Sequence, residues 1–190
     1  MSIANSITLI RIVMGPLFLF VYREYEMLHL SLVALPYILL FLLAIAELSD
    51  LCDGYVARKY GSVTDFGKVL DPMADSIYRI SVFLTFTLPP VNLPMILVFI
   101  FFYRDSVLST LRTICALKGF ALAARPSGKL KAVVQGVAGF FIILLLIPYS
   151  LGYLSESGLQ STSWTIVGLT GLYTLLSGVE YMYAHREYLT

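Results

Sequence analysis

Long apolar runs, separated by short polar segments, dominate this chain and predict how it folds. Each residue of an α-helix adds about 1.5 Å, so about 20 apolar residues cross a hydrocarbon core of roughly 30 Å. Most runs approach that length, and the third gains it by continuing a helix that starts near Asp71. The pattern predicts an all-α, polytopic membrane protein with six transmembrane helices. The apolar runs cover residues 7–22, 28–48, 77–88, 95–117, 132–147 and 164–184.

The composition agrees with a membrane protein. Hydrophobic residues make up 58% of the 190 residues and charged residues 13%, and the mean hydropathy is +0.84. So little polar surface cannot cover a soluble globule of this size, and the length fits one membrane domain over residues 1–190. The net charge of +1 gives no basic excess, which argues against nucleic-acid binding. Two cysteines are too few for a disulfide framework or a thiolate metal site.

Basic residues gather in alternate loops, and this sets the expected orientation. An even number of spans places both ends of the chain on one side, and cytoplasmic loops carry an excess of Lys and Arg. The opposite loops hold Arg23 together with Glu24, Glu26 and Glu156. We therefore expect both termini and the polar segment 49–76 on the cytoplasmic side. The basic residues of that side are Arg58, Lys59, Lys68, Lys118, Arg125, Lys129, Lys131 and Arg186.

Four aspartates lie in the polar segment 49–76. On a helix that turns about 100° per residue, Asp50 and Asp53 lie about 60° apart. Asp71 and Asp75, one turn apart, also share a face. Facing helix ends would bring the four carboxylates together at the cytoplasmic membrane surface, where they need counter-charge. Oxygen ligands without His or Cys favour Mg²⁺, Mn²⁺ or Ca²⁺ over zinc, and two such ions can clamp a diphosphate.

The residues beside the first two aspartates suit a nucleotide. Gly54 and Ala57 would let it approach the helix backbone, and Arg58 would neutralise phosphate charge. Two alternatives to a nucleotide site stay open, because acids also occur at solvated helix ends and in ion pathways. A transporter should carry acids near midmembrane in several spans, whereas these gather at one surface. A purely structural membrane protein has no need for Arg58, Gly67 and the acids at fixed spacing.

The spacing of eight residues across the segment resembles the full signature of the CDP-alcohol phosphotransferase family. The resemblance implies displacement at the β-phosphate of a CDP-activated lipid or alcohol, with release of CMP. It also implies two bound divalent cations, Mg²⁺ or Mn²⁺, and a bacterial cytoplasmic (inner) membrane location. The signature reads Asp50-x2-Asp53-Gly54-x2-Ala57-Arg58-x8-Gly67-x3-Asp71-x3-Asp75.

The resemblance also implies residue roles. Asp75 would be both a metal ligand and the catalytic base that takes the proton from the attacking hydroxyl. The metal ligands would be Asp50, Asp53, Asp71 and Asp75. The CDP-binding residues would be Gly54, Ala57, Arg58 and Gly67, with Asn5 and Thr8 supporting the nucleotide pocket. Asn5 is equally suited to be only a helix cap.

Two residues depart from the expected family pattern. Many members have Lys directly after the last aspartate, where this chain has Ser76. Glu47, one helical turn before Asp50, is also not expected from the family. Neither residue belongs to the signature.

A second group of charges predicts the acceptor alcohol. Arg104 and Arg112 lie within the fourth apolar run, where charge is costly, so they and Asp105 should face a polar cavity or one another. With Lys129 and Lys131 they would suit a phosphate, although the two lysines also fit ordinary cytoplasmic charge. A phosphate pocket beside the CDP site implies an acceptor alcohol that is itself phosphorylated.

Looser patterns resemble the phosphatidylglycerophosphate synthase subfamily, which transfers phosphatidyl from CDP-diacylglycerol to sn-glycerol 3-phosphate. Relatives that use inositol phosphate share the basic pocket and remain the alternative, with a divalent-ion transporter more distant. We also expect a homodimer, although the glycine pairs of the last two apolar runs are weak evidence for it. The patterns are Asn5-x2-Thr8-x2-Arg11, Arg104-Asp105-x3-Ser109-x2-Arg112 and Ser127-Gly128-Lys129-x-Lys131-x3-Gln135.

Overall fold

The computed structural model describes residues 3–59, 65–117 and 126–186, with side chains for residues 8–49, 70–115 and 126–186. Every regular element in these ranges is a helix, which confirms the all-α prediction. The helices are α1 (Ile3–Arg23), α2 (Leu35–Lys59), α3 (Asp65–Thr85), α4 (Met95–Leu117), α5 (Pro126–Ser150) and α6 (Glu156–Ala184).

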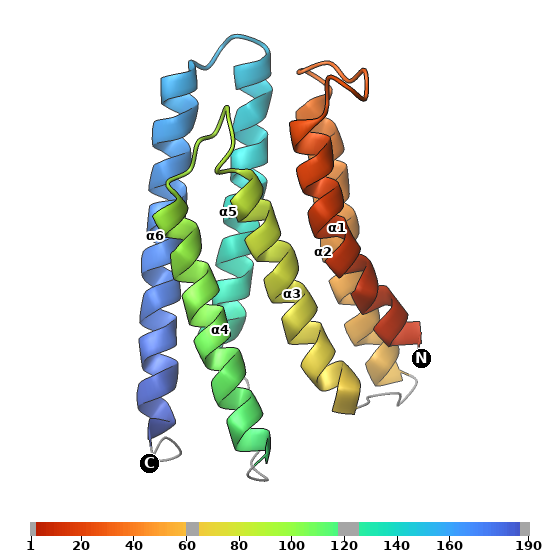
Figure 1. The fold of residues 1–190 in the computed structure, drawn as a ribbon, viewed down its shortest axis with the longest axis vertical. Helices are drawn as coiled ribbons and strands as arrows, with labels where there is room; N and C mark the ends of the chain where they lie inside the picture. Colours follow the sequence, from red (N-terminus) through yellow and green to blue (C-terminus); the bar gives the residue numbers. More distant parts are fainter. Residues whose placement is uncertain (1–2, 60–64, 118–125, 187–190) are drawn as a thin grey trace.

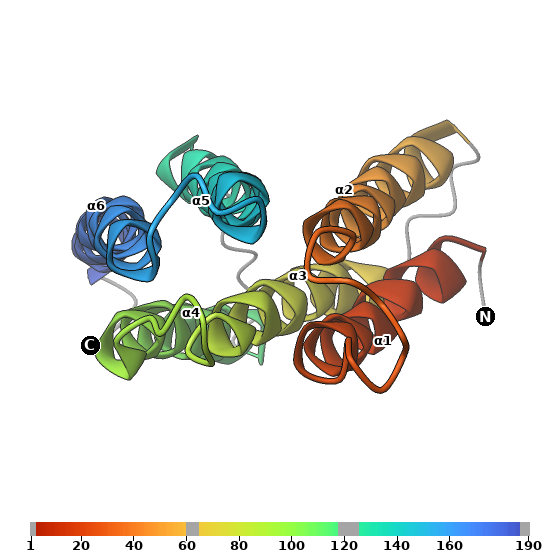
Figure 2. The ribbon, with the colours of Figure 1, turned by 90° about the horizontal axis from the view of Figure 1, so that it is seen from above.

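The helices run roughly along one axis, with α3 in the middle (Figures 1 and 2). α1 packs against α2 and α3, while α6 packs against α4 and α5. α3 also contacts α4 and α5, and α2 contacts α5, so α3 and α2 join the two groups. The C-terminal end of α2 and the N-terminal ends of α3 and α5 lie at the same end of the bundle (Figure 1).

The second helix begins later than the hydrophobic pattern predicts and extends further. Residues 24–34 form a series of turns, and His29 has a φ of 54°, which a helix does not accommodate. Pro36 occupies the first turn of α2, where its missing N–H leaves no helical bond unmade. The helix then continues to Lys59, so Asp50 and Asp53 lie on its last turns rather than after it.

The third and sixth helices also begin before the predicted positions. α3 begins at the acidic residue Asp65, so Gly67 lies in its first turn. Acidic residues are favourable at helix N-termini, because the helix dipole is positive there. α6 has the same feature in Glu156, and its N-cap residue Ser155 accepts a hydrogen bond at Oγ from the Gly158 N–H at 3.1 Å.

Aromatic side chains form the centre of the main core, at the end of the bundle away from the polar segment. The ring of Phe86 meets Phe18, Tyr22 and Phe83 edge to face, with centroid distances of 5.9, 6.1 and 6.3 Å. Phe83 in turn contacts Phe101 of α4 at 4.8 Å. Such edge-to-face pairs add specific geometry to apolar burial, so they fix α1, α3 and α4 relative to one another.

Large apolar side chains also point outward from all six helices. In six examples, one from each helix, the exposed fraction of the side chain runs from 45% at Leu84 to 67% at Ile96. Among the described helices, α5 is the one whose length and apolar composition are by themselves sufficient for a membrane span. The six examples are Val13, Phe41, Leu84, Ile96, Val133 and Leu169.

Close packing of α1 on α3 depends on Gly15. A Cβ at this position would lie 2.9 Å from both Cβ and Oγ of Ser81, and a Cβ cannot retreat without moving its helix. We expect Gly15→Ala to lower the free energy of unfolding by about 1–3 kcal/mol relative to Gly168→Ala. Gly168 is the matched control, because no described atom lies within 4 Å of its added Cβ. Thermal unfolding in detergent measures the difference, and equal midpoints would contradict it.

Candidate active site

Part of the predicted CDP and metal site lies outside the described side chains. The backbone of the acidic signature on α2 and the start of α3 is helical. The described side chains of the signature are those of Asp71 and Asp75 on α3. The residues whose side chains lie outside the description are Asn5, Asp50, Asp53, Gly54, Ala57, Arg58 and Gly67.

Asp71 is held by the first helix. The hydroxyl of Thr8, a buried residue of α1, donates a hydrogen bond to Oδ1 of Asp71 at 2.7 Å. The sequence assigned Thr8 to the nucleotide pocket, and the structure brings its hydroxyl to a predicted metal ligand. The bond restricts the rotation of this carboxylate, because one of its oxygens is fixed to a side chain of a different helix.

Asp75 is held by its own helix and, through Arg79, by the second helix. The Nε of Arg79 donates to Oδ1 of Asp75 at 2.8 Å, one turn along α3. The Nη1 of the same guanidinium lies 3.3 Å from Oε1 of Glu47 on α2. Glu47, unexpected for the family, therefore takes part in a chain of ion pairs that ends on a signature aspartate.

The described carboxylates suit a hard metal ion but do not complete its site. No group of three His, Cys, Asp or Glu residues among the described side chains is placed to hold a metal ion. In that part of the chain, Asp71 and Asp75 each accept hydrogen bonds at Oδ1 and none at Oδ2. Their second oxygens remain for a cation, and carboxylate oxygens are the donors that Mg²⁺ and Mn²⁺ prefer. The other two predicted ligands, Asp50 and Asp53, lie outside the described side chains.

A second polar cluster is centred on Asp105 of α4. The Nζ of Lys131 donates to both carboxylate oxygens of Asp105, at 2.9 and 2.8 Å. The Nη1 of Arg104 lies 3.0 Å from Oδ1, and the hydroxyl of Ser76 donates to Oδ2 at 2.7 Å. The expectation that Arg104 and Asp105 face one another is confirmed. We call these four residues the Asp105 cluster: Ser76, Arg104, Asp105 and Lys131.

The Asp105 cluster carries an excess of positive charge. Its one carboxylate faces two cations, and all three charged side chains are at most 10% exposed. The Nε of Arg104 is buried and has no hydrogen-bond partner among the described residues. The same holds for both side-chain polar atoms of Gln135, one turn after Lys131 on α5. Buried polar atoms without partners are costly, and two of these three, Arg104 Nε and Gln135 Nε2, are donors. With the excess of positive charge, they suit a polar, negatively charged ligand.

The other two basic residues predicted for the acceptor phosphate lie elsewhere. Arg112 packs against α6, with its guanidinium carbon 5.5 Å from the centre of the Tyr181 ring and its Nε 3.4 Å from the Tyr181 hydroxyl. Lys129 is exposed. The structure therefore brings together Arg104 and Lys131 but gives no contact that joins Arg112 or Lys129 to them.

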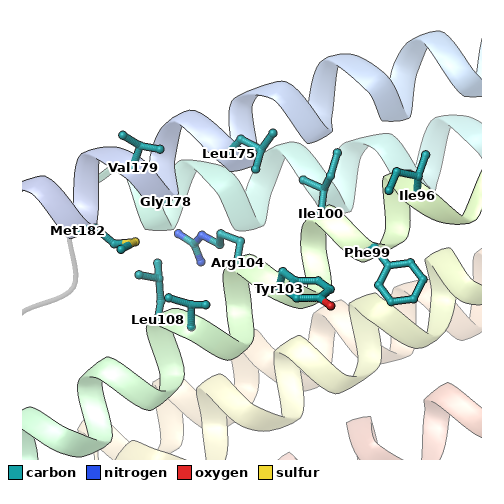
Figure 3. A pocket seen from close by; sticks show the side chains of 11 residues that line it. Ile96, Phe99, Ile100, Tyr103, Arg104, Leu108, Leu175, Gly178, Val179 and Met182 are labelled. Atoms are coloured by element: carbon teal, nitrogen blue, oxygen red, sulfur yellow. The ribbon is translucent and has the colours of Figure 1, made fainter.

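A groove of about 550 Å³ between α4 and α6 leads to Arg104 (Figure 3). Its other lining residues are almost all apolar, among them Phe99, Ile100 and Leu175. Gly178 of α6 leaves room for the arginine, because a Cβ there would lie 3.0 Å from its Cγ. The groove joins the apolar outer surface to one cation of the Asp105 cluster.

The sequence did not assign Arg79, Glu47 or Ser76 to the site, and it gave Asp105 no role beyond facing the arginines or a polar cavity. A signal existed for Arg79, since an acidic and a basic residue four apart on a helix commonly pair. The contacts of Glu47 and Ser76 join different helices, and no local pattern predicts them.

The charge balance of the Asp105 cluster predicts unequal costs of substitution. Asp105→Asn leaves two buried cations without their counter-charge, and we expect it to lower the free energy of unfolding by about 3–5 kcal/mol. Lys131→Met leaves the neutral pair of Arg104 and Asp105, so its cost should be smaller. The variant that combines both substitutions should be more stable than Asp105→Asn alone. Thermal unfolding of the three proteins in detergent tests this order, and a larger loss in Lys131→Met would contradict it.

Comparison with known proteins identifies the family. The family model described as CDP-alcohol phosphatidyltransferase matches residues 1–175. Members of this family generally use divalent metal ions.

Several curated relatives align over nearly the whole chain. The CDP-diacylglycerol--glycerol-3-phosphate 3-phosphatidyltransferase of Bacillus subtilis (strain 168) is 31% identical over 197 residues, covering 99% of this chain and 97% of the relative. A protein with the same name from Rickettsia felis is 28% identical, covering 98% and 97%. The probable phosphatidylglycerophosphate synthase of Mycobacterium tuberculosis (strain H37Rv) is 31% identical, covering 95% and 80%. The family resemblance seen in the signature is confirmed, and the chain belongs to the CDP-alcohol phosphatidyltransferase family.

Proposed function

We propose that this protein transfers the phosphatidyl group from CDP-diacylglycerol to sn-glycerol 3-phosphate, giving phosphatidylglycerol phosphate and CMP. Whole-length relatives that carry the name of this reaction support the assignment. The observation that carries it is the link between the two polar regions. Ser76 follows Asp75 directly and donates to Asp105, so the cationic cluster lies beside the acidic face of α3.

The Asp105 cluster would hold the phosphate of the acceptor. Its net positive charge attracts a phosphate, and Arg104 has a buried Nε still available for a hydrogen bond. Asp105 would keep Lys131 and Arg104 in place while the site is empty, because unpaired buried cations are unstable. Arg112 and Lys129 remain predicted contributors, and the cluster holds its positive charge without either of them.

Asp75 would act as the catalytic base. It takes the proton from the attacking glycerol hydroxyl, whose oxygen then bonds to the β-phosphorus of CDP-diacylglycerol. The bond from that phosphorus to the bridging oxygen breaks, and CMP leaves. Two divalent cations, Mg²⁺ or Mn²⁺, held by Asp50, Asp53, Asp71 and Asp75, would supply charge neutralisation for the diphosphate and the leaving oxygen.

The CDP portion would bind along the ends of α2 and α3. Gly54, Ala57, Arg58 and Gly67 would line it, with Asn5 and Thr8 of α1 in support. Small residues on α2 allow close approach of the nucleotide, and Arg58 would pair with the phosphates.

All six helices would cross the membrane, with the site and both termini on the cytoplasmic side. The apolar side chains that point outward from every helix support this proposal, because so large an apolar surface exposed to water would cause the protein to aggregate. The C-terminal end of α2 and the N-terminal ends of α3 and α5 lie at one end of the bundle (Figure 1), and their sequences include Arg58, Lys59, Lys68, Lys129 and Lys131. Basic residues of this kind favour the cytoplasmic side. We propose a multi-pass protein of the bacterial inner membrane, with a homodimer as the predicted assembly.

The proposed reaction is tested by CMP release from purified protein with CDP-diacylglycerol, Mg²⁺ or Mn²⁺, and separate candidate alcohols. We expect activity with glycerol 3-phosphate, loss of activity with a chelator, and recovery on adding either metal. Asp75→Asn should lower kcat by about 10²–10⁴-fold, since an amide cannot take the proton. Activity with inositol phosphate instead would overturn the choice of acceptor, and full activity in Asp75→Asn would overturn the assignment of the base.

The acceptor pocket is tested separately by Lys131→Met. One charged hydrogen bond to phosphate contributes about 1.5–3 kcal/mol, so the KM for glycerol 3-phosphate should rise about 10- to 100-fold. The KM for CDP-diacylglycerol, measured in the same titrations, should stay nearly constant and serves as the internal control. Equal increases in both constants would argue against an acceptor-specific role for this lysine.

A further inference from the structure

Arg79 occupies an unusual position for a charged residue, because it is almost completely buried between three helices. Its side chain is 9% exposed, although it extends from the middle of α3. Its guanidinium meets Asp75 on the same helix at 2.8 Å and Glu47 of α2 at 3.3 Å. A buried guanidinium is retained only where its donors are well satisfied, and here a signature carboxylate satisfies one of them.

Gly136 of α5 provides the space that Arg79 occupies. A Cβ at this position would lie 2.8 Å from Nη1 of Arg79 and 3.4 Å from Oε1 of Glu47. Any larger residue would therefore displace the end of the arginine side chain. The ion pairs and the glycine hold the guanidinium from three helices: α2, α3 and α5.

We propose that Arg79 is a positioning residue for Asp75, and that Glu47 and Gly136 act by fixing Arg79. The inference rests on the proposed function, in which Asp75 takes the proton from the acceptor alcohol. By binding Oδ1, Arg79 restricts the carboxylate to one orientation, while Oδ2 takes no part in this hydrogen bond. An aspartate without this contact rotates about its side-chain bonds, so the oxygen that accepts the proton is less often in place.

Both departures from the family pattern fit this role of Arg79. The cation beside Asp75 comes from Arg79, one turn later, and not from the next residue. Ser76, where many members have Lys, is engaged with Asp105 instead. Glu47 is the counter-charge that Arg79 needs on its second side.

The role of Arg79 is tested by steady-state kinetics of CMP release with both substrates varied. Arg79→Met should lower kcat on the order of 10- to 100-fold, because misplacement of a reacting group by about 1 Å has an effect of that size. Both KM values should change by less than about threefold, since Arg79 contacts neither substrate in the proposed mechanism. Arg79→Lys should recover part of kcat, because it restores the positive charge. If Arg79 had a purely structural role, Arg79→Met would lower the yield and the thermal stability of the protein but would not lower kcat selectively relative to the KM values.

Gly136→Ala moves Arg79 without removing its charge, and Gly139→Ala is its matched control one turn later on α5. A Cβ at Gly139 would make only an ordinary contact, 3.9 Å from Cγ1 of Val82. We expect kcat to fall severalfold or more in Gly136→Ala and to be unchanged in Gly139→Ala. Equal kcat in these two variants would overturn the proposal.

A double-variant comparison tests the role of Glu47. If Glu47 acts only through Arg79, then Glu47→Gln should lower kcat in the wild-type background and have no further effect in Arg79→Met. If the two substitutions instead lower kcat independently, so that their fold-changes multiply, the proposal that Glu47 acts through Arg79 is overturned. The activity of the wild-type protein separates this inference from the proposed function. If Arg79→Met has normal kinetics, only the inference about Arg79 is overturned. If the wild-type protein releases no CMP with any alcohol, both the inference and the proposed function are overturned.

Discussion

Charge buried among apolar helices is the constraint on which this structure depends. α3 carries acidic, basic and hydroxyl groups into the middle of the bundle, and several of them find partners on neighbouring helices. Asp71 accepts from Thr8 of α1, Arg79 meets Glu47 of α2, and Ser76 donates to Asp105 of α4. Because an unpaired buried polar group is costly, these contacts fix the rotation of α3 about its own axis. The same rotation places Asp71 beside α1 and Asp75 beside Arg79.

Two networks follow from that arrangement, and they differ in charge. In the first, Arg79 is one cation between the carboxylates of Asp75 and Glu47. In the second, Asp105 is one carboxylate between Arg104 and Lys131. In the proposed mechanism, the first network would orient the catalytic carboxylate and the second would bind the acceptor phosphate. Adjacent residues of α3, Asp75 and Ser76, belong to one network each, so the two partial sites lie next to each other.

The apolar parts of the chain make this polar centre possible. The aromatic contacts of Phe86 and Phe83 hold α1, α3 and α4 together at the opposite end, and Gly15 allows close approach of α1 and α3. With the helices fixed at that end, short hydrogen bonds can form near the other. The outward apolar side chains complete the division of the molecule into an apolar exterior and a polar, partly buried site.

The sequence by itself determined the helical class, the six helices of the described residues and the family. Hydrophobic run length and residue spacing carry that information, because both are local properties of a helical chain. Helix boundaries were less well predicted: the turns around His29 and the capping of α6 by Ser155 depend on backbone conformation that hydropathy does not record. Only the tertiary structure decided which charges pair. Arg104 and Lys131 meet on Asp105, while Arg112 packs against Tyr181, although all three basic residues looked alike in the sequence. The physical reason is that a buried charge is stabilised by its nearest counter-charge, and which residue is nearest depends on how separate helices pack.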